Sequence, residues 1–235
     1  MLWAVTLNLL KGFSVTCGLF ALTLVLGIPL GLLICFGLMN TWEPFKHSMH
    51  LEGRFTAAFQ DFRPVSAIIN VIVWVVRGTP LLLQLLIVYF AIPMLAGYQV
   101  FDRFEAAVVT FTVNYACYFA VIFRGGIQSV PRGQTEAGLV IGMTKGQIFR
   151  YVTLLQFIKR IMPPISNEII TLVKDTALAR VISVLEIIYY GYRYVTKDAL
   201  VWPLFYTGVF YLVFVGVLTI LFAKIEKKLD YIKIV

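Results

Sequence analysis

The chain has 235 residues, of which 60% are hydrophobic and 14% are charged. A water-soluble domain of this size does not tolerate such a composition, which excludes a soluble helical bundle and requires lipid to solvate much of the surface. The formal net charge of +8 does not indicate binding to nucleic acid, because the cations gather in the segments between apolar runs, as in membrane proteins.

Long apolar runs predict an all-α fold, a polytopic membrane protein with one transmembrane domain over residues 1–235. About 20 apolar residues cross a bilayer core of about 30 Å. The runs predict five transmembrane helices, at about residues 12–39, 65–96, 105–123, 163–189 and 200–223. The first run is too long for the core of a signal peptide, so we expect it to remain as a span. In the second, Gly78 and Pro80 follow Arg77 and predict a kink or an unwound turn.

The distribution of cations predicts the orientation in the membrane. Lysines and arginines lie mainly between spans one and two, between spans three and four, and in the C-terminal tail. The opposite side has Lys11, Arg103, Arg193 and Lys197. By the positive-inside rule, we expect the N-terminus outside and the C-terminus in the cytoplasm.

The loop after the first span, residues 40–64, mixes aromatic and cationic side chains, which predicts an interfacial segment. Its two histidines, His47 and His50, have i, i+3 spacing but no third ligand accompanies them. We therefore expect no metal site there.

The loop between spans three and four, residues 125–160, predicts a helix, an elbow and a second helix. The Ser-Val-Pro sequence at residues 129–131 is a helix-start signal, and the first helix is expected to run to about Ile141. Gly142 then ends it. Thr144 and Gln147 have the spacing of a capping box, which predicts the start of the second helix.

The same loop contains a motif with defined spacing. It consists of Glu136-Ala137-Gly138, three residues, Gly142, nine residues and then Val152-Thr153-Leu154-Leu155. The motif resembles the EAA loop of ABC importer permeases, with Gly138, Val152 and Leu155 in place of the usual Ala, Ile and Pro. Other segments resemble the polar amino-acid branch of this family, the histidine/glutamine-type permeases: Arg77-Gly78-Thr79-Pro80-Leu81-Leu82, Phe123-Arg124-Gly125-Gly126-Ile127, Pro163-Pro164 with Asn167-Glu168, and Lys174-Asp175-Thr176.

This resemblance implies a transport role in the bacterial inner membrane. It implies that a coupling helix contacts a cytoplasmic ATPase through Glu136, Ala137, Gly138, Gly142 and Met143. It also implies a dimer with an identical or sister permease, an external solute-binding protein and an amino-acid substrate. The sequence has no Walker-type phosphate loop, so we expect no cofactor and no catalysis in this chain, with ATP and Mg bound by the ATPase partner.

Ionisable groups within spans are costly, and they usually face a bundle interior or an aqueous path. The candidate residues of the substrate path are Arg77, Thr79, Asn114, Tyr118, Lys174, Asp175 and Arg180. The alternative is that these charges form structural networks that hold the bundle together. Other polar groups near this level are candidates for contact with an amino-acid head group: Thr112, Tyr115, Thr171 and Ser183.

Two departures from similar permeases bear on the substrate. Arg180 stands where these have a small residue, and Val121 stands where they have glutamate. Both changes make the membrane interior more positive. They predict a preference for a substrate with a carboxylate side chain, unless a paired subunit holds the substrate site.

Two other functions remain as alternatives. A secondary transporter driven by an ion gradient is expected to show inverted repeats, which this sequence lacks. A membrane anchor without a transport role has no use for charged residues within its spans.

Overall fold

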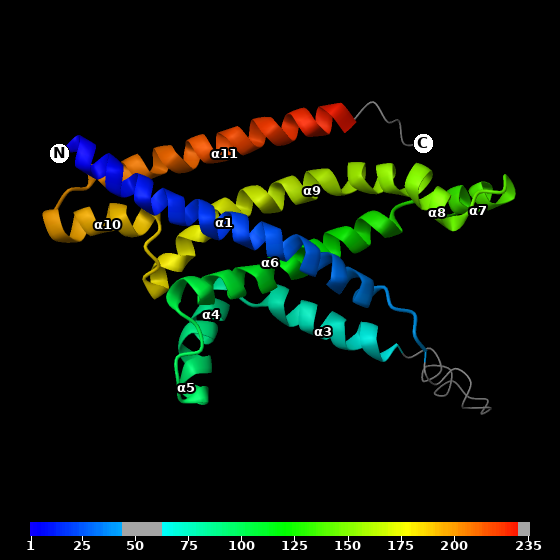
Figure 1. Ribbon diagram of the computed structural model, residues 1–235, viewed down its shortest axis with the longest axis horizontal. Helices are drawn as coiled ribbons and strands as arrows, with labels where there is room; N and C mark the ends of the chain where they lie inside the picture. The colour runs from blue at the N-terminus through cyan, green and yellow to red at the C-terminus, as the bar shows by residue number, and fades with distance from the viewer. Residues whose placement is uncertain (44–62, 230–235) are drawn as a thin grey trace.

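The computed structural model of the protein describes residues 1–43 and 63–229. Within these residues every element of regular secondary structure is a helix, which confirms the predicted all-α class (Figure 1). The predicted interfacial segment at residues 40–64 lies mostly outside the described residues.

The longer helices run along the long axis of the molecule (Figure 1). They are α1 (Leu2–Leu38), α3 (Pro64–Gly78), α6 (Arg103–Gln128), α9 (Leu154–Asp175) and α11 (Trp202–Leu229). At one end, called the elbow end, lie α7 (Arg132–Val140) and α8 (Lys145–Ile148). At the other end, called the α10 end, lie the N-terminus and α10 (Ile187–Asp198).

Three of the described helices, α1, α6 and α11, are long and apolar enough to cross a membrane. The helix α1 has 37 residues and begins well before residue 12, where the first span was expected to start. A fourth span is present if α3 and the segment that follows it form one bent span. The helix α9 is not among these candidates, so the count of five spans stays a prediction.

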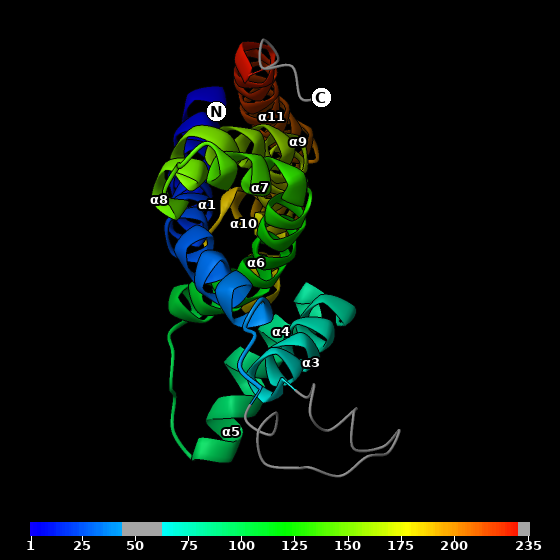
Figure 2. The ribbon, with the colours of Figure 1, turned by 90° about the vertical axis from the view of Figure 1, so that its right-hand side faces the viewer.

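The second apolar run is sharply bent, as Gly78 and Pro80 predicted. After α3 the chain leaves the helix at Thr79 and Pro80 and resumes as α4 (Leu81–Leu86), a π-helix (Ile87–Ala91) and α5 (Ile92–Ala96). The two halves meet at an angle of 101°. In Figure 2 the second half points away from the bundle.

The fourth predicted run does not form one α-helix. The helix that begins at α8 continues through a π-helix (Phe149–Thr153) into α9, with Pro163 and Pro164 inside it. It tightens to a 3-10 helix, η3 (Thr176–Ile182), and ends at Ser183, whose φ is 60°. The helix α10 then begins after Glu186, whose carboxylate accepts hydrogen bonds from two backbone N–H groups of its first turn.

The helices α1 and α6 approach each other closely over small residues. A Cβ atom on Gly31 would lie 2.8 Å from the Cβ of Phe119 and 2.9 Å from the carbonyl oxygen of Ala116. One turn earlier, a Cβ on Gly27 would lie 3.7 Å from the carbonyl oxygen of Thr112. Small residues four apart allow backbones to pack at such distances in membrane proteins. This contact fixes the position of α6 in the bundle.

We expect Gly31→Ala to lower the thermal unfolding temperature of the detergent-purified protein, followed by tryptophan fluorescence. The new methyl group meets a backbone carbonyl that cannot rotate away, at a cost of about 1–3 kcal/mol. That cost exceeds the gain of roughly 0.5–1 kcal/mol from replacing a helical glycine by alanine. Gly216→Ala is the control, because nothing lies within 4 Å of its added Cβ. Equal unfolding temperatures for the two variants would contradict the close contact.

Candidate functional site

A cavity of about 640 Å³ lies where the second apolar run breaks. Its walls are the broken turn, the middle of α6, the end of α9 and the start of η3. The polar side chains of the lining are Arg77, Thr79, Asn114, Tyr115, Tyr118, Glu168, Thr171 and Asp175. Segments far apart in the sequence therefore bring their polar groups to one place within an otherwise apolar bundle.

The side chain of Gln84 holds the broken turn in shape. Its amide nitrogen donates to the carbonyl oxygens of Val76, at 2.7 Å, and Thr79, at 3.1 Å. It also lies 2.8 Å from the Thr79 hydroxyl. The carbonyl oxygen of Gln84 accepts a hydrogen bond from the Asn114 amide of α6 at 3.0 Å. Carbonyl groups that the break frees from the helix thus have partners, as burial at this depth requires.

Three charged side chains line the cavity, one guanidinium and two carboxylates. The guanidinium carbon of Arg77 lies 4.9 Å from the ring centroid of Tyr118, within the range of a cation–π contact. The hydroxyl of Tyr115 donates to a carboxylate oxygen of Asp175 at 2.7 Å. Glu168 lies two turns before Asp175 on the same side of α9. The lining therefore has one more negative than positive charge.

The structure brings together most of the predicted path residues. Those that line the cavity are Arg77, Thr79, Asn114, Tyr118 and Asp175, together with the head-group candidates Tyr115 and Thr171. Lys174 is exposed and is not part of the lining, because neighbouring residues of a helix face different sides. Thr112 is buried in α6 outside the lining.

Arg180 lies on another surface of the protein. Its guanidinium carbon is 4.3 Å from the ring centroid of Tyr192 in α10. The reason is the change from α-helix to 3-10 helix after Asp175, which has three residues per turn and alters the direction of each later side chain. Val121 packs as a partly buried apolar side chain against the core. The predicted excess of positive charge in the interior is therefore wrong for this cavity.

Sequence reasoning did not select two residues that matter here, Gln84 and Glu168. Gln84 is the one amide side chain in the apolar stretch that follows the break, which was a usable signal. Glu168 is an ionisable group within the fourth apolar run, and the cost of burying it applied to it as much as to Asp175.

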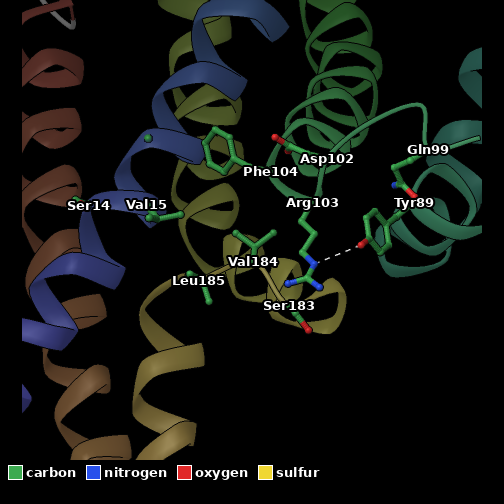
Figure 3. Close-up of a pocket in the computed structure, with 11 residues that line it drawn as sticks. Ser14, Val15, Tyr89, Gln99, Asp102, Arg103, Phe104, Ser183, Val184 and Leu185 are labelled. Carbon is green, nitrogen blue, oxygen red and sulfur yellow. Dashed lines mark hydrogen bonds between the residues drawn. The ribbon is translucent and has the colours of Figure 1, made fainter.

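A second hollow, of about 720 Å³, lies at the α10 end between α1, the π-helix after α4, the start of α6 and the link from η3 to α10 (Figure 3). Arg103 donates through Nε to the Tyr89 hydroxyl at 3.3 Å. Phe104 and Val184 form apolar walls. Ser183, a head-group candidate in the sequence, lies here rather than at the break.

The elbow predicted between spans three and four is present. Gly142 has a φ of 81°, a left-handed conformation that suits glycine, and its N–H donates to the carbonyl of Leu139 at 3.0 Å. Thr144 and Gln147 form the predicted capping box at the start of α8. The predicted helix is α7, which ends at Val140 with Ile141 as its C-cap.

The helices α7 and α8 pack closely against each other at Gly138. A Cβ atom on Gly138 would lie 2.8 Å from Cγ1 of Ile148, so this position has no room for a larger side chain without movement of Ile148. The amide of Gln156 donates to Gln134 of α7 at 2.5 Å, and Arg160 donates to the carbonyl of Ser129. The elbow is therefore attached to α9 by several contacts.

The outer side of α7 is exposed. Glu136 and Ala137 are both exposed, and the apolar side chains of Val140 and Ile141 keep 86% and 75% of their surface accessible. Met143 is half-buried, and its N–H donates to the Gly138 carbonyl at 3.0 Å. Exposed apolar side chains beside a charge, at the end of a bundle, are typical of a surface that another protein covers.

Comparison with known proteins gives consistent results. The sequence matches the family described as binding-protein-dependent transport system inner membrane component over residues 53–231. It is 34% identical over 223 residues to the arginine transport system permease protein ArtQ of Bacillus subtilis (strain 168), covering 94% of this chain and 92% of that protein. It is 37% identical over 162 residues to the glutamine transport system permease protein GlnP of Escherichia coli (strain K12), covering 68% and 73%. A crystal structure of an amino acid ABC transporter with histidines has a TM-score of 0.80 and 28% identity, covering 97% of this chain and 96% of that chain.

The family match extends over most of the chain, and the relative from Bacillus subtilis aligns over nearly the whole of both proteins. Both findings confirm the resemblance to ABC importer permeases that the EAA-type loop indicated. The chain belongs to the family of binding-protein-dependent transport system inner membrane components.

Proposed function

We propose that this protein is the translocation subunit of an ATP-driven importer of polar amino acids, and that the cavity at the break holds the substrate on its way through the membrane. The observation that supports this most strongly is the link between cavity and elbow. The helical run of residues 145–175 starts at the elbow and ends at Asp175 in the cavity wall. No break separates the two ends.

The elbow is also continuous with the opposite wall of the cavity. The helix α6 has Asn114 and Tyr118 in the lining and ends at Gln128, just before α7. A displacement of the elbow therefore acts on two walls of the cavity together. Movement of packed helices of this kind is a known route for opening one side of a site and closing the other.

We propose that an ATPase partner, which binds ATP and Mg, supplies this displacement by contact with Glu136, Ala137, Gly138, Gly142 and Met143. The elbow end then lies in the cytoplasm and the N-terminus outside, in the inner membrane of a bacterium. Cations at the elbow end support this orientation, among them Arg132, Lys145 and Arg150. A second permease subunit and an external solute-binding protein complete the importer.

The charges of the cavity suit a neutral or basic amino acid. Arg77 offers a cation to the α-carboxylate, and Asp175 and Glu168 offer carboxylates to the α-amino group and to a polar or basic side chain. Of the relatives, one is named for arginine transport and another for glutamine transport. The preference for an acidic substrate, which depended on Arg180, loses its physical basis.

The other functions have less support. An anchor without a transport role does not account for a polar cavity of this size inside the bundle. An ion-driven transporter does not account for an elbow with exposed apolar side chains at the end of the helix that reaches the cavity.

Glu136→Lys is expected to reduce ATP-dependent uptake of labelled amino acids into proteoliposomes that contain the whole complex. Loss of a coupling contact corresponds to a reduction of about 5- to 150-fold. Asp198→Lys is the matched control, because it makes the same change of charge at an exposed residue of the other end. If the intact wild-type complex takes up no amino acid, the proposed function is wrong.

Asp175→Asn is expected to raise the KM for uptake by about 10- to 100-fold, because a hydrogen bond to a charged group contributes roughly 1.5–3 kcal/mol. Lys174→Gln, at the neighbouring exposed residue outside the cavity, is expected to leave KM near the wild-type value. Initial rates of uptake over a range of substrate concentrations give the KM of each variant. An unchanged KM in Asp175→Asn would remove this residue from the substrate path.

Competition among unlabelled amino acids tests the charge of the cavity. We expect arginine and glutamine to compete with the transported substrate more strongly than glutamate does, because two carboxylates in the lining repel a third. Stronger competition by glutamate would restore the preference for an acidic substrate. A charge-neutral variant of Lys174 is the control, since that side chain does not line the cavity.

A further inference from the structure

Besides the cavity at the break and the hollow beside Arg103, the protein has a hollow of about 670 Å³ at the α10 end. It is formed by the end of η3 and one face of α10. We call it the basic hollow. The residues that give it its character are Arg180, Tyr189, Tyr192, Arg193, Thr196 and Lys197. It includes Arg180, a predicted path residue that does not line the cavity at the break.

Three cations line the basic hollow, and no carboxylate does. Arg193 and Lys197 are exposed, and in the described part of the chain neither forms a salt bridge. Arg180 lies against the ring of Tyr192, which leaves the N–H groups at the edge of its guanidinium available. Glu186 is the nearby carboxylate that interacts with Arg180, and it is buried outside the lining. The hollow thus concentrates three cations, of which Arg193 and Lys197 form no salt bridge within the described residues.

The helix α10 is held in a fixed position. Glu186 is fully buried, and its carboxylate accepts hydrogen bonds from two backbone N–H groups of the first turn. The Tyr194 hydroxyl accepts a hydrogen bond from the Asn8 amide at 2.7 Å. A Cβ on Gly191 would lie 2.6 Å from the side chain of Thr207, so α10 and α11 are in direct contact. The helix that carries Arg193 and Lys197 is therefore held against its neighbours, while Arg180 lies on η3.

The position of α11 indicates the depth of the hollow. Its uncharged stretch, residues 202–223, ends at Lys224 and matches the roughly 20 residues that cross a bilayer core. Trp202 therefore marks the membrane surface at the α10 end. Since Gly191 packs on Thr207, near this end of α11, α10 lies at the depth of the lipid headgroups (Figure 1). Tyrosine and cationic side chains are both favoured at that depth.

The cations of α10 are exceptions to the distribution of lysines and arginines between the two ends of the protein. Within the described residues, lysines and arginines are concentrated toward the elbow end, and the positive-inside rule disfavours them at the other. Arg193 and Lys197 are nevertheless placed at the α10 end, where they meet Arg180 around one concave surface. An anion bound between them would offset the repulsion among the three charges.

We propose that the basic hollow binds the anionic headgroup of a phospholipid, with the phosphate between Arg180, Arg193 and Lys197. Arginine suits a phosphate because its planar N–H groups donate in pairs, and lysine adds a point charge. Three cations favour a lipid with net negative charge over a zwitterionic one. An acidic protein surface is the other anion of this kind, but the depth of the hollow and its tyrosines favour a lipid.

Titration of the detergent-purified protein with phosphatidylglycerol, followed by native mass spectrometry, measures this binding. We expect wild-type protein to retain phosphatidylglycerol in preference to phosphatidylcholine. Arg193→Gln with Lys197→Gln is expected to weaken the binding of phosphatidylglycerol by roughly 30-fold, the effect of two cations at about 1 kcal/mol each. Both side chains are exposed, so the variant keeps the packing of the fold.

Lys11→Gln is the control, because Lys11 is an exposed cation of α1 outside the hollow. Equal binding of phosphatidylglycerol by the double variant and by this control would overturn the proposal. So would equal retention of the two lipids by the wild type. If the double variant instead keeps its lipid and loses affinity for an external binding protein, the hollow is a protein contact and the lipid proposal is wrong. The measurement needs neither ATP nor transport, so its result is independent of the proposed function.

Discussion

A backbone group that leaves its helix at membrane depth needs a hydrogen-bond partner, and the architecture of this protein depends on how that need is met at Thr79 and Pro80. Gln84 supplies the partner for the freed carbonyls, and Asn114 of α6 fixes Gln84 in turn. The helix α6 is itself fixed by its close contact with α1 at Gly31. The break is therefore stabilised through a chain of contacts that reaches across the bundle. A polar cavity can exist beside it because its walls cannot collapse.

This arrangement explains why the charged groups gather where they do. Arg77 ends α3 at the break, and the end of α9 brings Asp175 to the same level. Tyr115 and Tyr118, one turn apart on α6, contact one charge each: Tyr115 donates to the carboxylate and Tyr118 lies beneath the guanidinium. The aromatic face of α6 thus separates and supports opposite charges. The alternative that these charges only hold the bundle together accounts for the contacts, but it does not account for the open volume between them.

Local chemistry determined which features the sequence could predict. The elbow was predictable because Gly142 and the Thr144 capping box act within one or two turns of chain. The break was predictable for the same reason, since Pro80 removes a donor wherever it stands. The roles of Gln84 and Arg180 were not predictable, because each depends on a distant element, α6 for the first and α10 for the second. The 3-10 helix after Asp175 has no local signal of comparable strength. The period of about 3.6 residues therefore no longer predicts which way the side chains after Asp175 face.

The two prolines within α9 affect how this protein responds to force. Pro163 and Pro164 each lack the N–H that would close a helical turn, so the hydrogen-bond ladder between the elbow and Asp175 lacks two adjacent rungs. A rod with such a defect has its lowest bending stiffness at that point. Any bending of the helical run between the elbow and Asp175 is therefore expected to concentrate at these two prolines. The angle at this point then determines how far a displacement of the elbow moves the cavity wall.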